Sequence, residues 1–253
     1  MADAGPLIRK LENFAPLRGD DKRALDALAV REVKCYDARE DVIHDGDRPG
    51  HVHVVLDGFA CRYKTLEDGR RQITAYFVPG DFCDLHVFVL RAMDHSIGAL
   101  TPCTVSLVPR EAVLDLLARP ALARALWWAT LVDEAVLREW VVNLGRRDAR
   151  ERVGHVLCEL HMRLRAVGLA DGDACELPLT QTELADTLGL STAHINRTLQ
   201  QLRAEGLIEL RGKRLTILDA ARLRETALFD PNYLHLDREG GGRNARGDAG
   251  RRG

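Results

Sequence analysis

The sequence predicts an α+β protein in which an antiparallel β-roll, one long helix and a small domain of short helices with a β-hairpin follow one another. Three observations predict this order. Short extended runs broken by Gly, Pro and Asp fill residues 32 to 108, and no long helix interrupts them. Residues 120 to 145 then lack any helix breaker, and two short helical patterns meet at Gly189.

Length and composition allow two compact domains. The 253 residues are 46% hydrophobic and 29% charged, which is too apolar for a disordered chain. The net charge of −2 shows no overall basic bias of the kind that marks many nucleic-acid binders. The sequence shows no apolar run long enough to cross a membrane and no apolar signal-peptide core at its start. We therefore expect a cytoplasmic protein with no membrane partner.

Alternating apolar residues and turns predict the strands of the roll. Residues 59–64 are expected to pair with residues 71–78 across a turn that contains Asp68-Gly69, a hairpin signal. His51 and His53 stand two residues apart and so share a strand face. A solvent-facing strand explains them more simply than a metal pair, and we predict no metal site.

The long helix is apolar on more than one side. It is expected to follow a shorter helix that runs from Pro109 to about Leu117. A helix with two apolar stripes needs two surfaces to bury it, and these are most simply its own roll and the same helix of a second chain. A helix fully buried within a monomer is the alternative. The predicted dimerisation residues form one stripe: Leu122, Leu126, Ala129, Val136 and Trp140.

The strongest motif lies between Leu179 and Leu218. Thr180 and Glu183 have capping-box spacing, Gly189 permits a tight turn, and Ser191 can cap the helix that follows. Residues 207 to 218 resemble a β-hairpin wing. The pattern is therefore that of a winged helix-turn-helix, preceded by a helix that begins after Asp148 and by a loop over residues 166–176.

One face of the second motif helix exposes side chains that can contact bases or phosphates, and a packing helix has no reason to expose such a set. Basic residues outnumber acidic ones between residues 191 and 214, so positive charge is local. The predicted DNA-binding residues, with those of the wing, are Thr180, Ser191, Thr192, Ala193, His194, Asn196, Arg197, Gln200, Gln201, Arg203, Lys213 and Arg214.

Together with residues 42–47 (VIHDGD) and 79–82 (PGDF), these parts resemble the CRP/FNR family of transcription regulators, in the family's order over residues 7 to 220. The resemblance implies a cyclic-nucleotide-binding-like roll, a dimerising helix, a palindromic DNA operator and RNA polymerase as a protein partner. Arg197 falls on the family's guanine-reading arginine and Asn196 on a neighbouring base-reading position. Ala193 stands where many members carry a base-reading glutamate, so the operator should differ from the best-known sites.

The resemblance also sets the expected domain boundaries. Residues 1–118 form the sensor roll with flanking helices, and residues 119–147 form the long helix and hinge. Residues 148–237 form the DNA-binding domain. The arginine-rich tail at 238–253 has no apolar anchor and is expected to be disordered.

The expected effector pocket follows the Pro-Gly-Asp-Phe turn. Its residues are Gly80, Asp81, Phe82, Cys83, Asp84, Leu85, His86, His95 and Ser96. Members that bind cyclic AMP resemble one another in a Gly-Glu pair after this turn and an arginine before a Ser or Thr. Here Cys83-Asp84 and His95 stand at those places, which argues against cyclic AMP.

Other signals stay open at this point. No cysteine precedes Cys35, which argues against the N-terminal iron–sulfur cluster of some members. Cys83 and His86 are similar to the ligand pair of haem-binding members, so haem or a redox event at Cys83 is an alternative to a buried core cysteine.

Two other function classes compete with the DNA-binding regulator. The winged helix could bind a protein partner instead of DNA. An enzyme is disfavoured, because no Ser-His-Asp order, Gly-rich phosphate loop, HExxH pair or carboxylate constellation is present.

Overall fold

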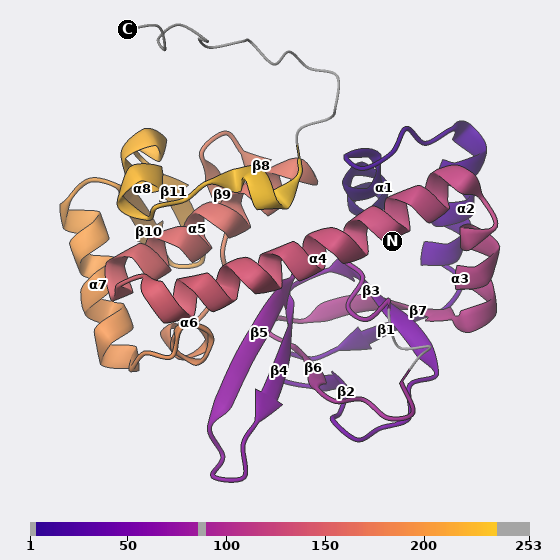
Figure 1. Ribbon diagram of the computed structural model, residues 1–253, viewed down its shortest axis with the longest axis horizontal. Coiled ribbons are helices and arrows are strands. Elements are labelled where there is room, and N and C mark those ends of the chain that lie inside the picture. Colours follow the sequence, from indigo (N-terminus) through magenta and orange to yellow (C-terminus); the bar gives the residue numbers. More distant parts are fainter. Residues whose placement is uncertain (1–3, 86–89, 237–253) are drawn as a thin grey trace, which may run out of the picture.

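The computed structural model describes residues 4–85 and 90–236 of the chain. The predictions for His86 and for the tail at 238–253 therefore lie outside the described residues. The strands of the roll gather at one end of helix α4, and helices α5 to α8 gather at its other end (Figure 1). This arrangement confirms the α+β class and the predicted order of the parts.

Two antiparallel sheets form the roll. One has the strand order β1-β7-β3 and the other the order β2-β6-β4-β5. The predicted hairpin is present, with Ala60 opposite Phe77 and Thr65 opposite Arg71. The strands are β1 (Val33–Tyr36), β2 (Asp41–Ile43), β3 (His51–Asp57), β4 (Ala60–Thr65), β5 (Arg71–Phe77), β6 (Ser96–Ala99) and β7 (Cys103–Pro109).

The prediction that His53 faces solvent was wrong. Strand β3 is buried on both faces, and His53 is 5% exposed. Its ring Nδ1 lies 2.6 Å from Asp84 Oδ2, and its backbone N–H donates to Asp84 Oδ1 at 2.7 Å. A polar ring can be buried when it has such a hydrogen-bond partner. The alternation of residues along a strand does not reveal this partner, because Asp84 lies 31 residues away in the sequence.

The helices agree closely with the sequence pattern. The Asp148–Glu151 capping box starts α5 as predicted, and the long helix ends one residue beyond Gly145. The helices are α1 (Gly5–Glu12), α2 (Gly19–Ala29), α3 (Arg110–Leu117), α4 (Pro120–Arg146), α5 (Ala149–Ala166), α6 (Gln181–Leu188), α7 (Thr192–Ala204), α8 (Ala220–Thr226) and the 3-10 turn η2 (Pro231–Leu234). None of the helices in the described ranges is both long and apolar enough for a membrane span.

The stripe of α4 that was predicted to meet a second chain is instead covered by its own chain. Leu122, Leu126, Ala129, Val136 and Trp140 are all at most 8% exposed. Helix α4 packs against α1, α3, α5, β5 and the C-terminal turn η2. The C-terminal segment of the same chain therefore covers part of α4.

A different apolar face of α4 is open. Trp127 and Val141 are each 65% exposed, and Leu131, Leu137 and Val142 are also exposed. At 100° per residue, Trp127, Leu131, Val141 and Val142 fall on the side of the helix opposite to the buried stripe. The exposed ion pair between Glu134 and Arg138 lies among them.

The third sheet extends the predicted wing. Strands β10 (Ile208–Arg211) and β11 (Arg214–Ile217) form the expected hairpin. The segment 166–176, expected to be a loop, contains strands β8 (Ala170–Asp171) and β9 (Ala174–Glu176), and β9 pairs with β11. Strand β11 supplies the hydrogen-bond partners of β9, so this strand forms through a tertiary contact. The local Gly and Asp content alone indicates a loop.

Candidate DNA-binding surface and effector region

The helix-turn-helix is built by caps, a turn glycine and a small core. Glu183 N–H donates to Thr180 Oγ1 at 3.2 Å, and Thr180 N–H donates to Glu183 Oε2 at 2.6 Å, so α6 begins with the predicted capping box. Gly189 has φ of 61°, a left-handed conformation that glycine adopts without strain. Ser191 Oγ accepts from His194 N–H and caps α7. The apolar side chains of both helices then turn inward, since Leu184 and Ile195 are buried.

The face of α7 opposite this core is open. Asn196 is half-buried and its neighbours on this face are exposed. Of the predicted DNA-binding residues, these lie exposed on or beside α7: Ser191, Thr192, Ala193, His194, Arg197, Gln200, Gln201 and Arg203. The structure therefore brings together most of the predicted set on one surface.

Two predicted residues point elsewhere. Gln201 Nε2 donates to Glu205 Oε1 at 3.1 Å, so its amide is engaged with its own helix. Lys213 lines a groove that it shares with the roll residues Asp57 and Phe59. Arg211, which was not among the predicted DNA-binding residues, lines a depression together with Gln200 and Arg203 of α7. Only the tertiary structure shows which basic residue of the wing adjoins α7.

The sequence also missed Gln181, the first residue of α6. Asn196 Nδ2 donates to Gln181 Oε1 at 3.2 Å, and Gln200 Nε2 donates to Asn196 Oδ1 at 3.0 Å. The available signal was the position of Gln181 directly after the predicted DNA-contacting cap Thr180.

The expected effector residues that are described are mostly buried. Leu85 is half-buried, and the following residues are buried: Gly80, Asp81, Phe82, Cys83, Asp84, His95 and Ser96. The carboxylate of Asp84 is hydrogen bonded to the His53 ring, and Arg62 Nη2 donates to the carbonyl oxygen of Cys83 at 2.6 Å. Polar groups of the chain itself thus contact the segment that follows the turn.

Cys83 has the environment of a core residue. Its side chain is fully buried, and burial, with Asp84 nearby, raises the pKa of its thiol well above the ordinary value. A neutral buried thiol is a poor nucleophile and reacts slowly with oxidants. This environment disfavours the redox interpretation of Cys83, and the haem interpretation depends on His86, which is outside the described residues. Within the described ranges, no three His, Cys, Asp or Glu side chains are grouped to hold a metal ion.

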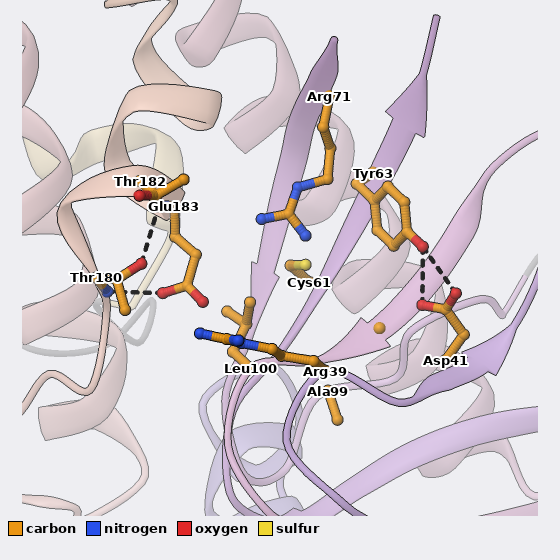
Figure 2. Close-up of a pocket in the computed structure, with 11 residues that line it drawn as sticks. Arg39, Asp41, Cys61, Tyr63, Arg71, Ala99, Leu100, Thr180, Thr182 and Glu183 are labelled. Carbon is orange, nitrogen blue, oxygen red and sulfur yellow. Dashed lines mark hydrogen bonds between the residues drawn. The ribbon is translucent and has the colours of Figure 1, made fainter. Parts of the chain in front are cut away.

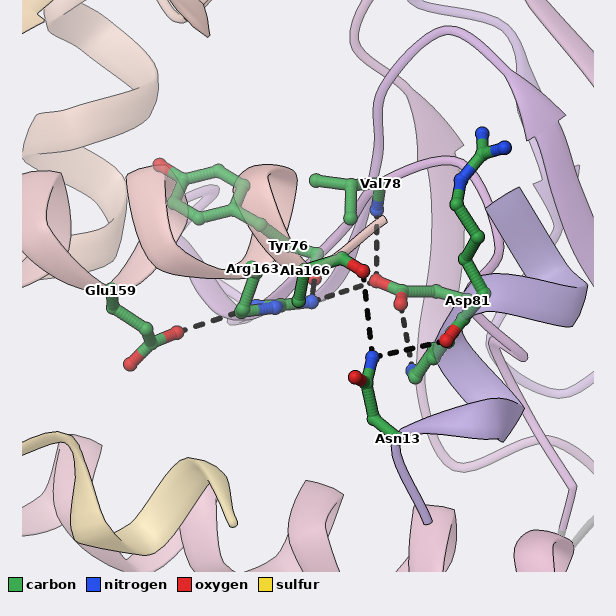
Figure 3. A network of polar contacts seen from close by, with 9 residues as sticks. Asn13, Tyr76, Val78, Asp81, Glu159, Arg163 and Ala166 are labelled. Atoms are coloured by element: carbon green, nitrogen blue, oxygen red, sulfur yellow. Dashed lines mark hydrogen bonds and ion pairs between the residues drawn. The ribbon is translucent and has the colours of Figure 1, made fainter. Parts of the chain in front are cut away.

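A buried ionic network joins the turn of the roll to the DNA-binding domain (Figure 3). Lys10 Nζ lies 2.7 Å from Asp81 Oδ1, and Arg163 Nη2 lies 2.7 Å from Asp81 Oδ2. Arg163 also donates to the carbonyl oxygen of Tyr76 at 2.7 Å and contacts Glu159 at 3.3 Å. Burial alone would raise the pKa of Asp81, but the charges of Lys10 and Arg163 outweigh it and hold the pKa below its ordinary value.

Glu159 continues the network to two further elements. Its Oε2 accepts from Trp140 Nε1 at 2.9 Å and from Tyr233 Oη at 2.8 Å. Burial raises the pKa of Glu159, although Arg163 and these donors oppose the shift. Helices α1, α4 and α5, the turn after β5, and η2 are therefore tied at one point. We call these side chains (Lys10, Asp81, Trp140, Glu159, Arg163 and Tyr233) the interdomain network.

A second contact between the domains surrounds a pocket of about 330 Å³ at the start of α6 (Figure 2). Arg39 and Arg71 extend into it from the roll, and Glu183 and Asp41 line it too. Two carboxylates balance two guanidinium groups, so the charges give no preference for an anion. Arg71 Nε also donates to Asp186 Oδ2 at 2.9 Å, which makes this contact a docking point for α6.

Comparisons with known proteins agree with this architecture. Residues 20–120 match the family model of the cyclic nucleotide-binding domain, and residues 151–226 match that of the Crp-like helix-turn-helix domain. The chain is 32% identical over 215 residues to the transcriptional activator protein FnrL of Cereibacter sphaeroides, which covers 83% of this chain and 86% of that protein.

Two further relatives are similar over most of their lengths. The nitrogen fixation regulation protein FixK of Bradyrhizobium diazoefficiens is 32% identical over 211 residues, covering 81% of this chain and 88% of FixK. The solved structure of FixK2 from Bradyrhizobium japonicum superposes with a TM-score of 0.69 at 28% identity, covering 77% of this chain and 96% of that one. These relatives are transcription regulators and not enzymes.

Proposed function

Because the chain belongs to the CRP/FNR family of transcription regulators, we propose that it binds a palindromic operator as a homodimer. We further propose that a signal at the β-roll changes its affinity for that operator. The single observation that carries the proposal is the open face of α7, where Thr192, Arg197 and Gln200 are exposed on a helix whose other side is buried. A helix of this kind fits the major groove of DNA.

The base-reading roles rest on the chemistry of the exposed groups. Arg197 is free to donate two hydrogen bonds to the O6 and N7 atoms of guanine, the commonest specific contact. Arg203 and Arg211 lie beside this face and would contact phosphates, which carry no sequence information. Thr180 caps α6 at its exposed end, where a phosphate contact is also expected. RNA polymerase is the protein partner that we propose for the DNA-bound form.

The exposed apolar face of α4 supports the dimer. A soluble monomer rarely exposes several large apolar side chains on one face of a helix, and such a face marks an interaction site. We propose that Trp127, Leu131 and Val141 meet the same residues of a second chain. In a dimer whose two-fold axis runs between the paired α4 helices, we expect the two α7 helices to contact half-sites about one DNA turn, roughly 34 Å, apart.

The interdomain network supports the signalling part of the proposal. Asp81 lies two residues before Cys83 and three before Asp84, within the expected effector segment, and it holds Arg163 of α5 directly. A ligand that displaces this turn would therefore act on the orientation of the DNA-binding domain. The groups that hold cyclic AMP in similar proteins are absent at their places, so we propose another signal.

Selection of bound duplexes from a random pool tests the proposal. We expect recovery of a palindromic motif, together with binding that weakens steeply as salt rises, because phosphate contacts release counterions. Recovery of no motif, with binding that is independent of salt, would contradict DNA recognition and would favour a protein partner for the winged helix.

A further inference from the structure

Three polar side chains form a hydrogen-bonded chain across the open face of the helix-turn-helix. We propose that Gln181 is a positioning residue that fixes the amide of Asn196, so that Asn196 reads an adenine in each half-site. The inference rests on the proposed function, because it assigns a base preference to a surface that is proposed to face DNA. It adds a residue, Gln181, and a base that the resemblance to known regulators does not supply.

The geometry links both helices of the motif. Gln181 is the first residue of α6, and its Oε1 accepts from Asn196 Nδ2 at 3.2 Å across 15 residues of sequence. Gln200, one turn after Asn196 on α7, donates from Nε2 to Asn196 Oδ1 at 3.0 Å. Both ends of the Asn196 amide are therefore held, one from each helix.

The position of Gln181 is itself fixed. The capping box of Thr180 and Glu183 sets the first turn of α6, and Leu184 anchors the helix in the core. Tyr76 of the roll donates to the carbonyl oxygen of Glu183 at 3.2 Å. A side chain on so constrained a turn can hold a partner at a defined angle.

A count of donors and acceptors gives the base. A side-chain amide has two N–H groups and two oxygen lone pairs. Gln181 accepts one N–H of Asn196 and Gln200 donates to one lone pair of its oxygen, which leaves Asn196 with one donor and one acceptor. Adenine presents the matching pair in the major groove, the N7 acceptor and the N6 amino donor.

The hydrogen-bonded chain also restrains the orientation of the Asn196 side-chain amide. The terminal torsion of asparagine is broad, and a free amide can turn to offer its donor where its acceptor should be. In the structure Gln181 accepts and Gln200 donates, and the amide of Asn196 can reverse only if both glutamine amides reverse with it. Loss of the Gln181 acceptor should therefore weaken base choice more than overall affinity.

Selection from a random duplex pool with four variants of the full-length protein tests this role. Asn196→Ala should reduce the preference for one A·T pair per half-site by about 5-fold to 100-fold. Gln181→Met keeps the length of the side chain but replaces the amide oxygen with a thioether, which is only a weak acceptor. It should reduce the preference at the same pair about threefold or more while the Arg197 guanine is unchanged. Gln181→Glu keeps the acceptor and should retain the adenine preference, although its negative charge weakens binding to all duplexes alike.

Thr182→Ala is the matched control, since Thr182 is the next exposed residue on the same turn and should leave the motif unchanged. The inference is overturned if Gln181→Met weakens every duplex equally, which would make Gln181 a phosphate contact. It is also overturned if Asn196→Ala leaves all motif positions unchanged. Both outcomes still yield a wild-type motif, whereas failure of the proposed function yields none.

Discussion

Under the proposed function, single side chains on α7 divide into those expected to read bases, those expected to contact phosphates and those that hold their neighbours. Arg197 is exposed, whereas Gln201 is hydrogen bonded to Glu205 at the side of the helix. Neighbouring residues of one helix therefore have different expected effects on specificity. The environment of a side chain also decides the charge of a buried histidine.

Replacing Arg197 by alanine should cost about 1–3 kcal/mol of operator binding and relax the choice of one guanine per half-site. The reason is the loss of a bidentate contact that only guanine can satisfy. Equilibrium binding to operator variants measures the change, and Gln201→Ala is the control with little effect. Equal losses for Arg197→Ala on specific and random DNA would make Arg197 a phosphate contact instead.

His155 should make folding stability depend on pH. Its ring is fully buried, stacks on Tyr233 at 5.8 Å and makes no hydrogen bond within the described part of the chain. Burial, and then the charge of Arg147, lower its pKa to about 3. Glu139, 3.3 Å from Nε2, is already paired with Arg147 at 2.6 Å.

The unfolded chain takes up the His155 proton near pH 6.5, and the folded chain takes it up only near pH 3. The free energy of unfolding should therefore fall by about 1.4 kcal/mol per pH unit from this group as pH drops below 6.5. His155→Phe keeps an aromatic ring and should flatten that slope between pH 7 and pH 5. Urea unfolding measures it, and identical slopes in the two proteins would show that His155 does not remain neutral.

At the scale of elements, α4 carries two apolar faces with different roles. One packs on its own chain, and Trp140 lies edge-on to Tyr76 with ring centroids 5.7 Å apart. The other face, with Trp127, Leu131 and Val141, is exposed. Charges placed on the first face should prevent folding, and charges placed on the second should prevent association only.

The double variant Leu131→Glu, Val141→Glu should be a folded monomer that binds the operator weakly. Carboxylates on the open face repel each other across a two-fold axis, whereas in the monomer they face water. Sedimentation gives the mass and circular dichroism gives the fold. Leu114→Glu is the control on α3, where the exposed fraction is 50%, as it is for Leu131. A dimer that survives the double variant would place the interface elsewhere.

Across the two domains, the interdomain network connects the expected effector segment with α5. Replacing Arg163 by methionine leaves Glu159, which is fully buried, without its cation, while Asp81 keeps Lys10. Removal of one partner of a buried pair costs about 3–5 kcal/mol, and one of the contacts that hold the helix-turn-helix domain to the roll is lost.

We therefore expect Arg163→Met to unfold at lower urea concentration and to lose operator affinity. Arg70→Met removes an exposed pair with Asp68, away from the open face of α4, and should change stability by no more than about 1 kcal/mol. Equal stability of the two variants would show that the network contributes little to holding the domains together.

Cyclic AMP should leave operator affinity unchanged within about twofold, because Cys83-Asp84 and His95 stand where similar proteins carry the groups that hold the nucleotide. A true effector usually changes the affinity at least about fivefold. Fluorescence anisotropy of a labelled operator with and without the nucleotide measures this. A larger shift would show that some group outside the usual places, such as the exposed Arg91, neutralises the cyclic phosphate.

The sequence pattern was enough to predict the order of the parts, the caps of α5, α6 and α7, the β4–β5 hairpin and the exposed face of α7. These features depend on near neighbours: caps act over three residues, and helix faces repeat every three or four. The tertiary structure alone decided which stripe of α4 is buried, that His53 is paired with Asp84, and that Gln181 and Arg211 adjoin α7. Those contacts form between residues that are far apart in the sequence. The partner of a buried polar group, or of a second apolar stripe, can therefore be identified only in the folded structure.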